Sequence, residues 1–126
     1  MGQREAPPRK VVLVVEDEPL LRMTAVDMVE DAGFEAVEAA DATEAVRILE
    51  TRADITIVFT DIDMPRGMDG MRLAACIRDR WPPIEIILTS GHLVPPAEAL
   101  PARSRFFAKP YRHESVVAEL RRMAAA

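Results

Sequence analysis

The chain has 126 residues, which is the size of one ordinary domain and too short for two. Its apolar fraction of 49% and charged fraction of 29% are typical of a soluble globular protein, and without a run of about 18 apolar residues no membrane span is expected. A net charge of −5 argues against a nucleic-acid surface, because phosphate binding needs a basic stripe. The single cysteine, Cys76, excludes a disulfide within the chain and favours a reducing cytoplasm.

The first half of the chain predicts two strands and two helices. Residues 10–15 contain a continuous valine-rich run, which is typical of a strand covered on both faces. Apolar residues at helical spacing then predict a helix over 19–32, which begins with a proline and is followed by Gly33, a residue typical of helix C-termini. Residues 35–39 predict a short strand. An aspartate, with a glutamate three positions later, predicts the start of a helix over 41–51.

The second half continues this alternation. A buried strand is expected over 55–60, followed by a helix over 70–80 that begins after an aspartate and ends at a Trp-Pro-Pro sequence. A fourth strand is expected over 84–89 and a short fifth strand over 105–108. The amphipathic pattern of 114–123 predicts a last helix.

The connection between the fourth and fifth strands is rich in proline. Pro95, Pro96 and Pro101 leave room for only a turn or two of helix, because proline removes a backbone donor and clashes with the preceding turn. We therefore expect the fourth helix, within residues 93–104, to be short or irregular.

Strands that alternate with helices predict an α/β fold, with helices on both faces of a five-stranded parallel sheet. Right-handed crossovers bring the C-terminal ends of the strands to one edge, where open α/β sheets bind their ligands. Polar side chains directly follow four of the five strands at this edge. They are Glu16, Asp17 and Glu18 after the first strand, Asp61 and Asp63 after the third, Ser90 after the fourth and Lys109 after the fifth.

The charges of these side chains indicate a chemistry. Two carboxylates about 4 Å apart repel by roughly 1 kcal/mol in water and by about 4 kcal/mol at an effective dielectric near 20, so several acids held together need a cation. A cluster of oxygen ligands suits Mg²⁺, which keeps several waters and leaves room for phosphate oxygens. Lys109 adds a compact positive charge, and Ser90 a hydroxyl that could bond a phosphoryl oxygen. With one carboxylate as nucleophile, such a site is suited to phosphoryl transfer.

From about Lys10 to Met123 the chain resembles the receiver domains of two-component signalling. Each matching piece is short, but five of them occur in order at the expected strand ends. They are Glu16-Asp17 after VVLVV, the TDIDMP stretch that contains Asp61, Asp69-Gly70, Ser90-Gly91, and Lys109-Pro110.

The resemblance implies a role for each acid. Asp61 is implied to be the phosphoacceptor and a ligand of Mg²⁺. Asp17 is implied to hold the metal directly, Glu16 to hold it through water, and Asp63 to bind it through its backbone carbonyl. Lys109 is implied to pair with the phosphoryl group.

The resemblance also implies a fold, a switch and partners. The sheet order would be 2-1-3-4-5, as in flavodoxin-like folds, with residues 1–9 as a disordered tail and 10–123 as the receiver domain. Ser90 would move toward the phosphoryl group, Phe106 would follow it inward, and the bond before Pro110 would be cis. The implied phosphoryl donor is a histidine kinase or a histidine phosphotransfer protein. The chain itself would be a cytoplasmic signalling protein, a monomer or weak dimer, that acts by contact with other proteins.

Several positions depart from the common pattern of that family. The segment between Ser90 and Lys109 is shorter than usual, which affects the surface that normally contacts downstream proteins. Arg66-Gly67 lengthen a loop by one residue. Asp63 and His92 occupy positions that, in the family, modulate how long the phosphoryl group lasts.

Two other functions are compatible with parts of the sequence. A phosphohydrolase of the haloacid-dehalogenase type also carries paired aspartates after an apolar strand, like Asp61 and Asp63. Against it, Met64 and Pro65 follow, the pair lies on the third strand, and no room remains for a cap domain. A receiver-like module that binds partners without phosphate is a further alternative, and the presence of all the acceptor-site residues argues against it.

Overall fold

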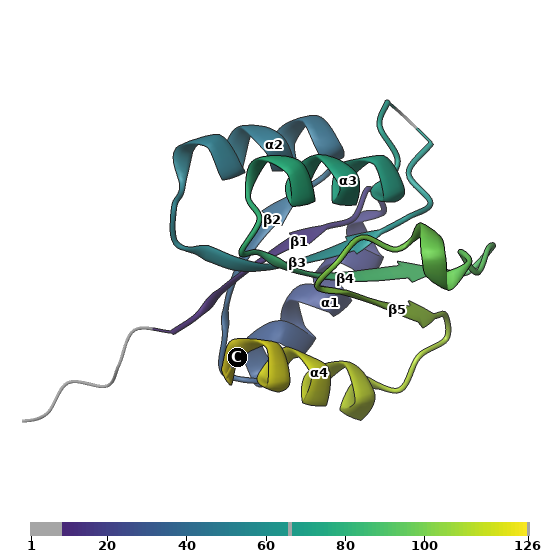
Figure 1. Ribbon diagram of the computed structural model, residues 1–126. Coiled ribbons are helices and arrows are strands. Elements are labelled where there is room, and N and C mark those ends of the chain that lie inside the picture. Colours follow the sequence, from purple (N-terminus) through teal and green to yellow (C-terminus); the bar gives the residue numbers. More distant parts are fainter. Residues whose placement is uncertain (1–8, 66, 126) are drawn as a thin grey trace, which may run out of the picture.

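The computed structural model describes residues 9–65 and 67–125. Five parallel strands form one sheet in the order β2-β1-β3-β4-β5, which confirms the predicted fold (Figure 1). The predicted tail at 1–9 lies outside the described residues except for Arg9, and the predicted loop lengthening falls partly on residue 66, which also lies outside them. The strands are β1 (Val11–Val15), β2 (Glu35–Ala39), β3 (Ile55–Asp61), β4 (Glu85–Ser90) and β5 (Ser104–Ala108).

Helices cover both faces of the sheet. Helices α2 and α3 lie on one face, and α1 and α4 lie on the other (Figure 1). The proline-rich connection between β4 and β5 contains a single turn of 3₁₀-helix, as the prolines predicted. The bounds are α1 (Pro19–Asp31), α2 (Ala42–Thr51), α3 (Gly70–Arg80), η1 (Ala97–Ala99) and α4 (His113–Ala125). None of these helices is long and apolar enough to cross a membrane.

The core has two halves, one on each face of the sheet. Successive strand residues point to opposite faces, so Leu13 of β1 packs toward α2 and α3 while Val12 and Val14 pack toward α1 and α4. All five residues of β1 are buried, as expected for an inner strand of a sheet covered on both sides. Burial on both faces fixes the register of the strands, and therefore which side chains reach the C-terminal edge.

Side-chain caps set the starts of α2 and α3. The Asp41 carboxylate accepts a hydrogen bond from the Glu44 amide at 2.8 Å, and the Asp69 carboxylate accepts one from the Arg72 amide at 2.9 Å. Each cap satisfies a backbone donor that the first turn of a helix leaves free. The cap at Asp69 matters most for function, because it places α3 directly after the loop that follows Asp61.

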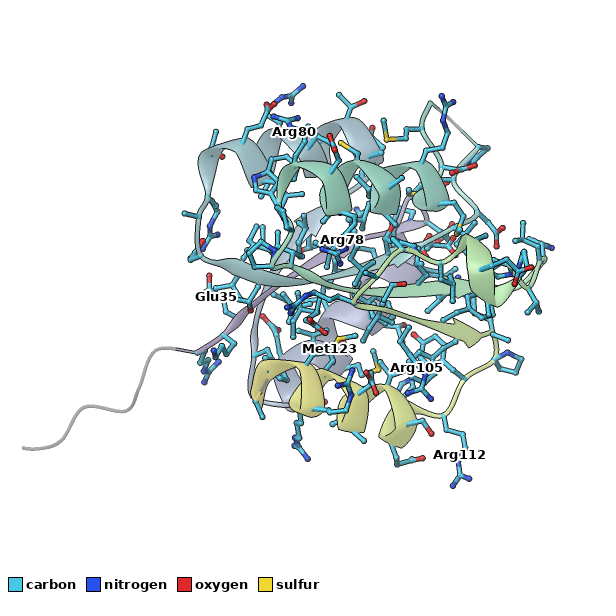
Figure 2. The ribbon with its side chains drawn as sticks, viewed as in Figure 1. Glu35, Arg78, Arg80, Arg105, Arg112 and Met123 are labelled. Carbon is cyan, nitrogen blue, oxygen red and sulfur yellow. The ribbon has the colours of Figure 1, made fainter. Side chains whose placement is uncertain are left out.

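The crossover from β4 to β5 is mostly irregular, so its backbone groups need partners from elsewhere. Arg78 of α3, whose side chain is labelled in Figure 2, binds the end of this crossover and also the loop between α3 and β4. Its guanidinium donates to the carbonyls of Ala102 (2.7 Å), Pro82 (2.5 Å) and Ile84 (2.7 Å). Arg103, which follows, has a φ of 58° and turns the chain into β5. The α3 helix therefore holds the end of the crossover, which takes the place of a regular helix between β4 and β5.

Candidate functional site

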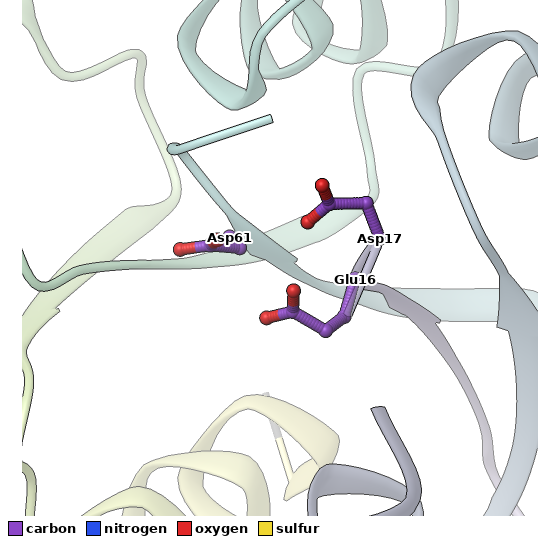
Figure 3. Close-up of side chains that lie close together, drawn as sticks. All are labelled: Glu16, Asp17 and Asp61. Atoms are coloured by element: carbon purple, nitrogen blue, oxygen red, sulfur yellow. The ribbon is translucent and has the colours of Figure 1, made fainter. Parts of the chain in front are cut away.

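Three carboxylates from two strand ends meet at the C-terminal edge of the sheet. Asp61 is the last residue of β3, and Glu16 and Asp17 directly follow β1. The three groups each offer an oxygen within 4.8 Å of the others (Figure 3). Glu16 and Asp61 are buried, whereas Asp17 is exposed to solvent. Neighbouring parallel strands thus bring together acids that are more than forty positions apart in the sequence.

Lys109 faces this acidic cluster from the end of β5. Its Nζ lies 3.3 Å from Asp61 Oδ1 and 3.5 Å from Glu16 Oε1. The Lys109 amide donates to the Ser90 carbonyl at 2.9 Å, which continues the pairing of β4 with β5 up to the site. The bond between Lys109 and Pro110 is cis, as expected. A positive charge from β5 thus lies beside the two buried acids.

The first residue of α3 lies against the backbone at the end of β3. The Gly70 amide donates to the Ile62 carbonyl at 3.1 Å. A Cβ atom at position 70 would lie 2.2 Å from the Asp61 carbonyl oxygen and 2.7 Å from Ile62 Cα, distances that real side chains do not adopt. Only glycine allows this approach. The sequence identified Gly70 as part of a motif, but it gave no physical reason for the glycine.

Burial raises the pKa values of the two inner acids. The pKa of Glu16 rises to about 7, chiefly because burial disfavours the charged form, with a smaller contribution from the negative charge of Asp61. Burial also raises the pKa of Asp61, and the ammonium of Lys109 opposes this rise. Negative charge is thus costly here unless a cation accompanies it.

The donor set fits a hard divalent cation. Asp61 Oδ1 is buried and makes no hydrogen bond of good geometry within the described part of the chain, although the Lys109 ammonium lies close to it. A buried charged oxygen without a donor is unfavourable and is usually explained by an ion or water. Because Glu16, Asp17 and Asp61 offer only oxygen ligands, they suit Mg²⁺ better than a soft metal. The acidic cluster that could hold a metal contains Glu16, Asp17 and Asp61. The backbone carbonyl of Asp63, also expected as a ligand, stays a prediction.

Ser90 ends β4 and is 2% exposed. Its hydroxyl donates to Asp63 Oδ2 at 2.8 Å, and the Gly91 amide donates to the same oxygen at 3.2 Å. The sequence assigned Asp63 a role only through its backbone carbonyl, so this side-chain contact is new. Phe106 is half-buried, pairs with Leu88 across the sheet, and packs against the core on the α2 and α3 face.

A cavity of about 390 Å³ opens beside Lys109, on the side of α1 and α4. Tyr111 lines it and contacts Phe59 edge-on, with ring centroids 6.2 Å apart. Burial, with the nearby charges of Glu16 and Asp61, raises the pKa of Tyr111. Sequence reasoning missed this residue, although its place directly after Lys109-Pro110 was a signal.

Comparisons with known proteins show which sequences and folds this chain is similar to. The family model of the response regulator receiver domain matches residues 12–121. Sensor kinase CckA of Brucella abortus (strain 2308) is 34% identical over 116 residues, which are 89% of this chain and 12% of that protein. Response regulator protein FleR of Pseudomonas aeruginosa is 37% identical over 81 residues, which are 64% of this chain and 17% of that protein. The chain therefore spans less than a fifth of either relative.

Solved structures give the same result. The crystal structure of a response regulator receiver protein from Sinorhizobium medicae WSM419 superposes with a TM-score of 0.86 at 25% identity, covering 94% of this chain and 96% of that one. The receiver domain from Hybrid Histidine Kinase CckA superposes with a TM-score of 0.74 at 27% identity, covering 90% of this chain and 97% of that one.

Proposed function

The chain belongs to the response regulator receiver domain family of two-component signalling, and from this premise we propose that it accepts a phosphoryl group on Asp61. The observation that carries the proposal is the buried Asp61 carboxylate, which lies 3.3 Å from the Lys109 ammonium and beside two further acids. In this proposal residues 10–123 are the working unit. The donor is a histidine kinase or a histidine phosphotransfer protein in the cytoplasm, and relatives named as sensor kinases support that assignment.

Each side chain has a defined part in the reaction. An oxygen of the Asp61 carboxylate attacks the phosphorus, the bond from phosphorus to the donor's histidine nitrogen breaks, and an acyl phosphate forms. The Lys109 ammonium offsets the negative charge carried by the transferred oxygens. Ser90 offers its hydroxyl to one of these oxygens. The chain itself supplies these groups, so we expect it to catalyse its own phosphorylation and dephosphorylation.

Mg²⁺ is the proposed cofactor. Asp61 and Asp17 would hold it directly, Glu16 through water, and Asp63 through its backbone carbonyl; when bound, the ion neutralises charge on the phosphoryl oxygens. Saturating Mg²⁺ should stabilise the folded protein by about 2.7 kcal/mol at a hundred times the dissociation constant. The variant Asp17→Asn should lose most of this effect. An equal Mg²⁺-dependent rise in melting temperature in that variant would place the ion elsewhere.

Labelling with acetyl phosphate and Mg²⁺ tests the proposal. Intact-mass analysis should show one added phosphoryl group per chain, released by hydroxylamine, and none in Asp61→Asn. The matched control Asp54→Asn removes a carboxylate from an exposed position outside the site and should label like the unchanged protein. Label that survives Asp61→Asn would move the acceptor. Steady turnover of p-nitrophenyl phosphate without stoichiometric label would instead favour a phosphohydrolase.

Phosphorylation would signal by changing shape. We propose that the phosphoryl group shifts the balance between two conformations that both exist beforehand, with Ser90 and Phe106 as the moving side chains. Comparing amide NMR spectra with and without beryllofluoride and Mg²⁺ tests this. Unchanged resonances around β5 and α4 would contradict it. The signal would pass to another protein, with the chain acting as a monomer or weak dimer.

A further inference from the structure

We propose that the Asp63 side chain is a positioning residue, which holds the Ser90 hydroxyl away from the phosphoryl site until Asp61 is modified. The inference rests on the phosphoacceptor function proposed for Asp61. It assigns the side chain of Asp63 a role separate from the metal-binding role of its backbone carbonyl.

Four hydrogen bonds centre on Asp63 and Ser90. Asp63 Oδ2 accepts from the Ser90 hydroxyl at 2.8 Å and from the Gly91 amide at 3.2 Å. Ser90 Oγ in turn accepts from the amides of His92 and Leu93, both at 3.1 Å. Ser90 is almost fully buried, so water competes poorly for its hydroxyl. The carboxylate therefore fixes the hydroxyl, and the hydroxyl fixes the first turn of the crossover to β5.

The geometry makes two states mutually exclusive. A serine hydroxyl carries one proton and can donate one hydrogen bond. In this structure that proton goes to Asp63, so Ser90 cannot also donate to a phosphoryl oxygen on Asp61. When Ser90 turns toward the phosphoryl group, Asp63 Oδ2 loses its strongest donor. Asp63 thus opposes the movement that phosphorylation requires.

The same movement releases the chain that follows Ser90. If Oγ leaves its place, the amides of His92 and Leu93 lose their acceptor, and residues 91–94 must find a new arrangement. This segment presents two apolar side chains to solvent, Leu93 at 47% and Val94 at 73% exposure. The Asp63 contact therefore ties the arrangement of this exposed apolar pair to the state of Asp61.

A matched pair of variants isolates the hydrogen bond. Asp63→Asn and Asp63→Leu remove the same charge and have similar size, but only asparagine keeps an oxygen that can accept from Ser90. Both leave the backbone carbonyl of residue 63 in place. We expect the Leu variant to favour the turned position of Ser90 about tenfold more than the Asn variant, the size expected for one buried hydrogen bond between neutral groups.

The first readout needs no phosphodonor. Amide NMR shifts and hydrogen exchange of Gly91, His92 and Leu93 are measured in the metal-free protein and its variants. In Asp63→Leu these amides should exchange faster and move toward the shifts that beryllofluoride with Mg²⁺ produces in the unchanged protein. In Asp63→Asn they should stay near the starting values, so the conservative variant rescues the contact.

A second comparison shows whether Asp63 acts through Ser90. In the Ser90→Ala background, the difference between the Asn and Leu variants at the amides of His92 and Leu93 should disappear; the Gly91 amide is left out of this comparison because it donates to the Asp63 oxygen directly. Equal behaviour of the two variants would overturn the proposal, because charge alone would then explain the effect. A difference that persists in Ser90→Ala would overturn it as well. If Asp63→Leu fails to fold, Asp63→Ala gives the same test.

The outcome can be separated from failure of the phosphoacceptor proposal. If acetyl phosphate labels neither the unchanged protein nor its variants, and beryllofluoride changes no resonance, Asp61 is not the acceptor. The role proposed for Asp63 is then overturned as well. If labelling succeeds but the amides of residues 91–93 are indifferent to the loss of the Asp63 oxygen, only the inference about Asp63 is overturned.

Discussion

The close approach of α3 to the end of β3 gives the sharpest test of the structure. In Gly70→Ala the new Cβ would lie 2.2 Å from the Asp61 carbonyl oxygen and 2.7 Å from Ile62 Cα. Overpacking of this kind costs about 1–3 kcal/mol, and here the upper end applies because backbone atoms cannot move aside as a side chain can. Alanine also gains up to about 1 kcal/mol over glycine in a helix. The clash should win, with a net loss of about 2 kcal/mol.

Urea denaturation followed by circular dichroism measures this loss. With a slope of about 2 kcal/mol per molar urea, the midpoint should fall by about 1 M. The melting temperature should fall by about 8 °C for a chain of this size. Gly91→Ala is the matched control, because its nearest atom, Lys109 Cβ, lies 3.8 Å from the added carbon. A Gly70→Ala midpoint equal to that of the unchanged protein would refute the close contact between α3 and Asp61.

Three further predictions concern charged side chains. In metal-free protein the pKa of the buried Glu16 is raised to about 7, so between about pH 4.5 and 7 the folded protein keeps a proton that the unfolded chain has lost. The free energy of unfolding should therefore fall as pH rises through this range. Urea titrations in the presence of a chelator should show a weaker pH dependence of this free energy in Glu16→Gln. The pKa of Glu119 is lowered by Arg122 and, less strongly, by Arg105. The ionised Glu119 therefore stabilises the fold fully above the ordinary pKa of glutamate, and this stabilisation is lost as pH falls through the lowered pKa. Glu119→Gln should lose less stability than the unchanged protein as the solution is acidified, and an equal loss in both proteins would contradict this. Arg78→Ala should cost about 2 kcal/mol, because it leaves one carbonyl of the crossover and two carbonyls of the loop between α3 and β4 without their donor. Arg78→Lys should recover only part of this stability, because an ammonium cannot reach all three carbonyls. Equal urea midpoints for the Lys variant and the unchanged protein would refute the shared role of the guanidinium.

The sequence predicted the sheet well because strand and helix patterns are strong in this chain. The valine run predicted a buried strand, which is β1, and the prolines between the last two strands predicted a short helical segment, which is η1. Boundaries were less accurate. The third strand was expected to end at Thr60, whereas β3 includes Asp61, whose pairing with Thr89 continues the sheet by one residue. Pairing with a neighbour, not local propensity, decides where such a strand ends.

The candidate site was predictable in outline because parallel strands bring their ends together. Its details were not. The hydrogen bond between Ser90 and Asp63 depends on side-chain rotamers across 27 positions of sequence. The need for glycine at position 70 depends on how closely α3 approaches β3. Leu21 is one of the apolar residues whose helical spacing predicted the helix over 19–32, yet it is 48% exposed and lines the cavity beside Tyr111. Such contacts arise only when the elements pack.

Helix α3 contacts two distant parts of the molecule through its opposite ends. Gly70, at its start, touches the Asp61 backbone, and Arg78, in its last turn, binds the crossover that leads into β5. The helix has 11 residues and is about 16 Å long, and a hydrogen-bonded helix is stiff along its axis. A displacement of the Asp61 loop would therefore be carried as a rigid-body movement to the opposite edge of the sheet. Insertions or deletions inside α3 should break this mechanical link even where the acidic cluster stays intact.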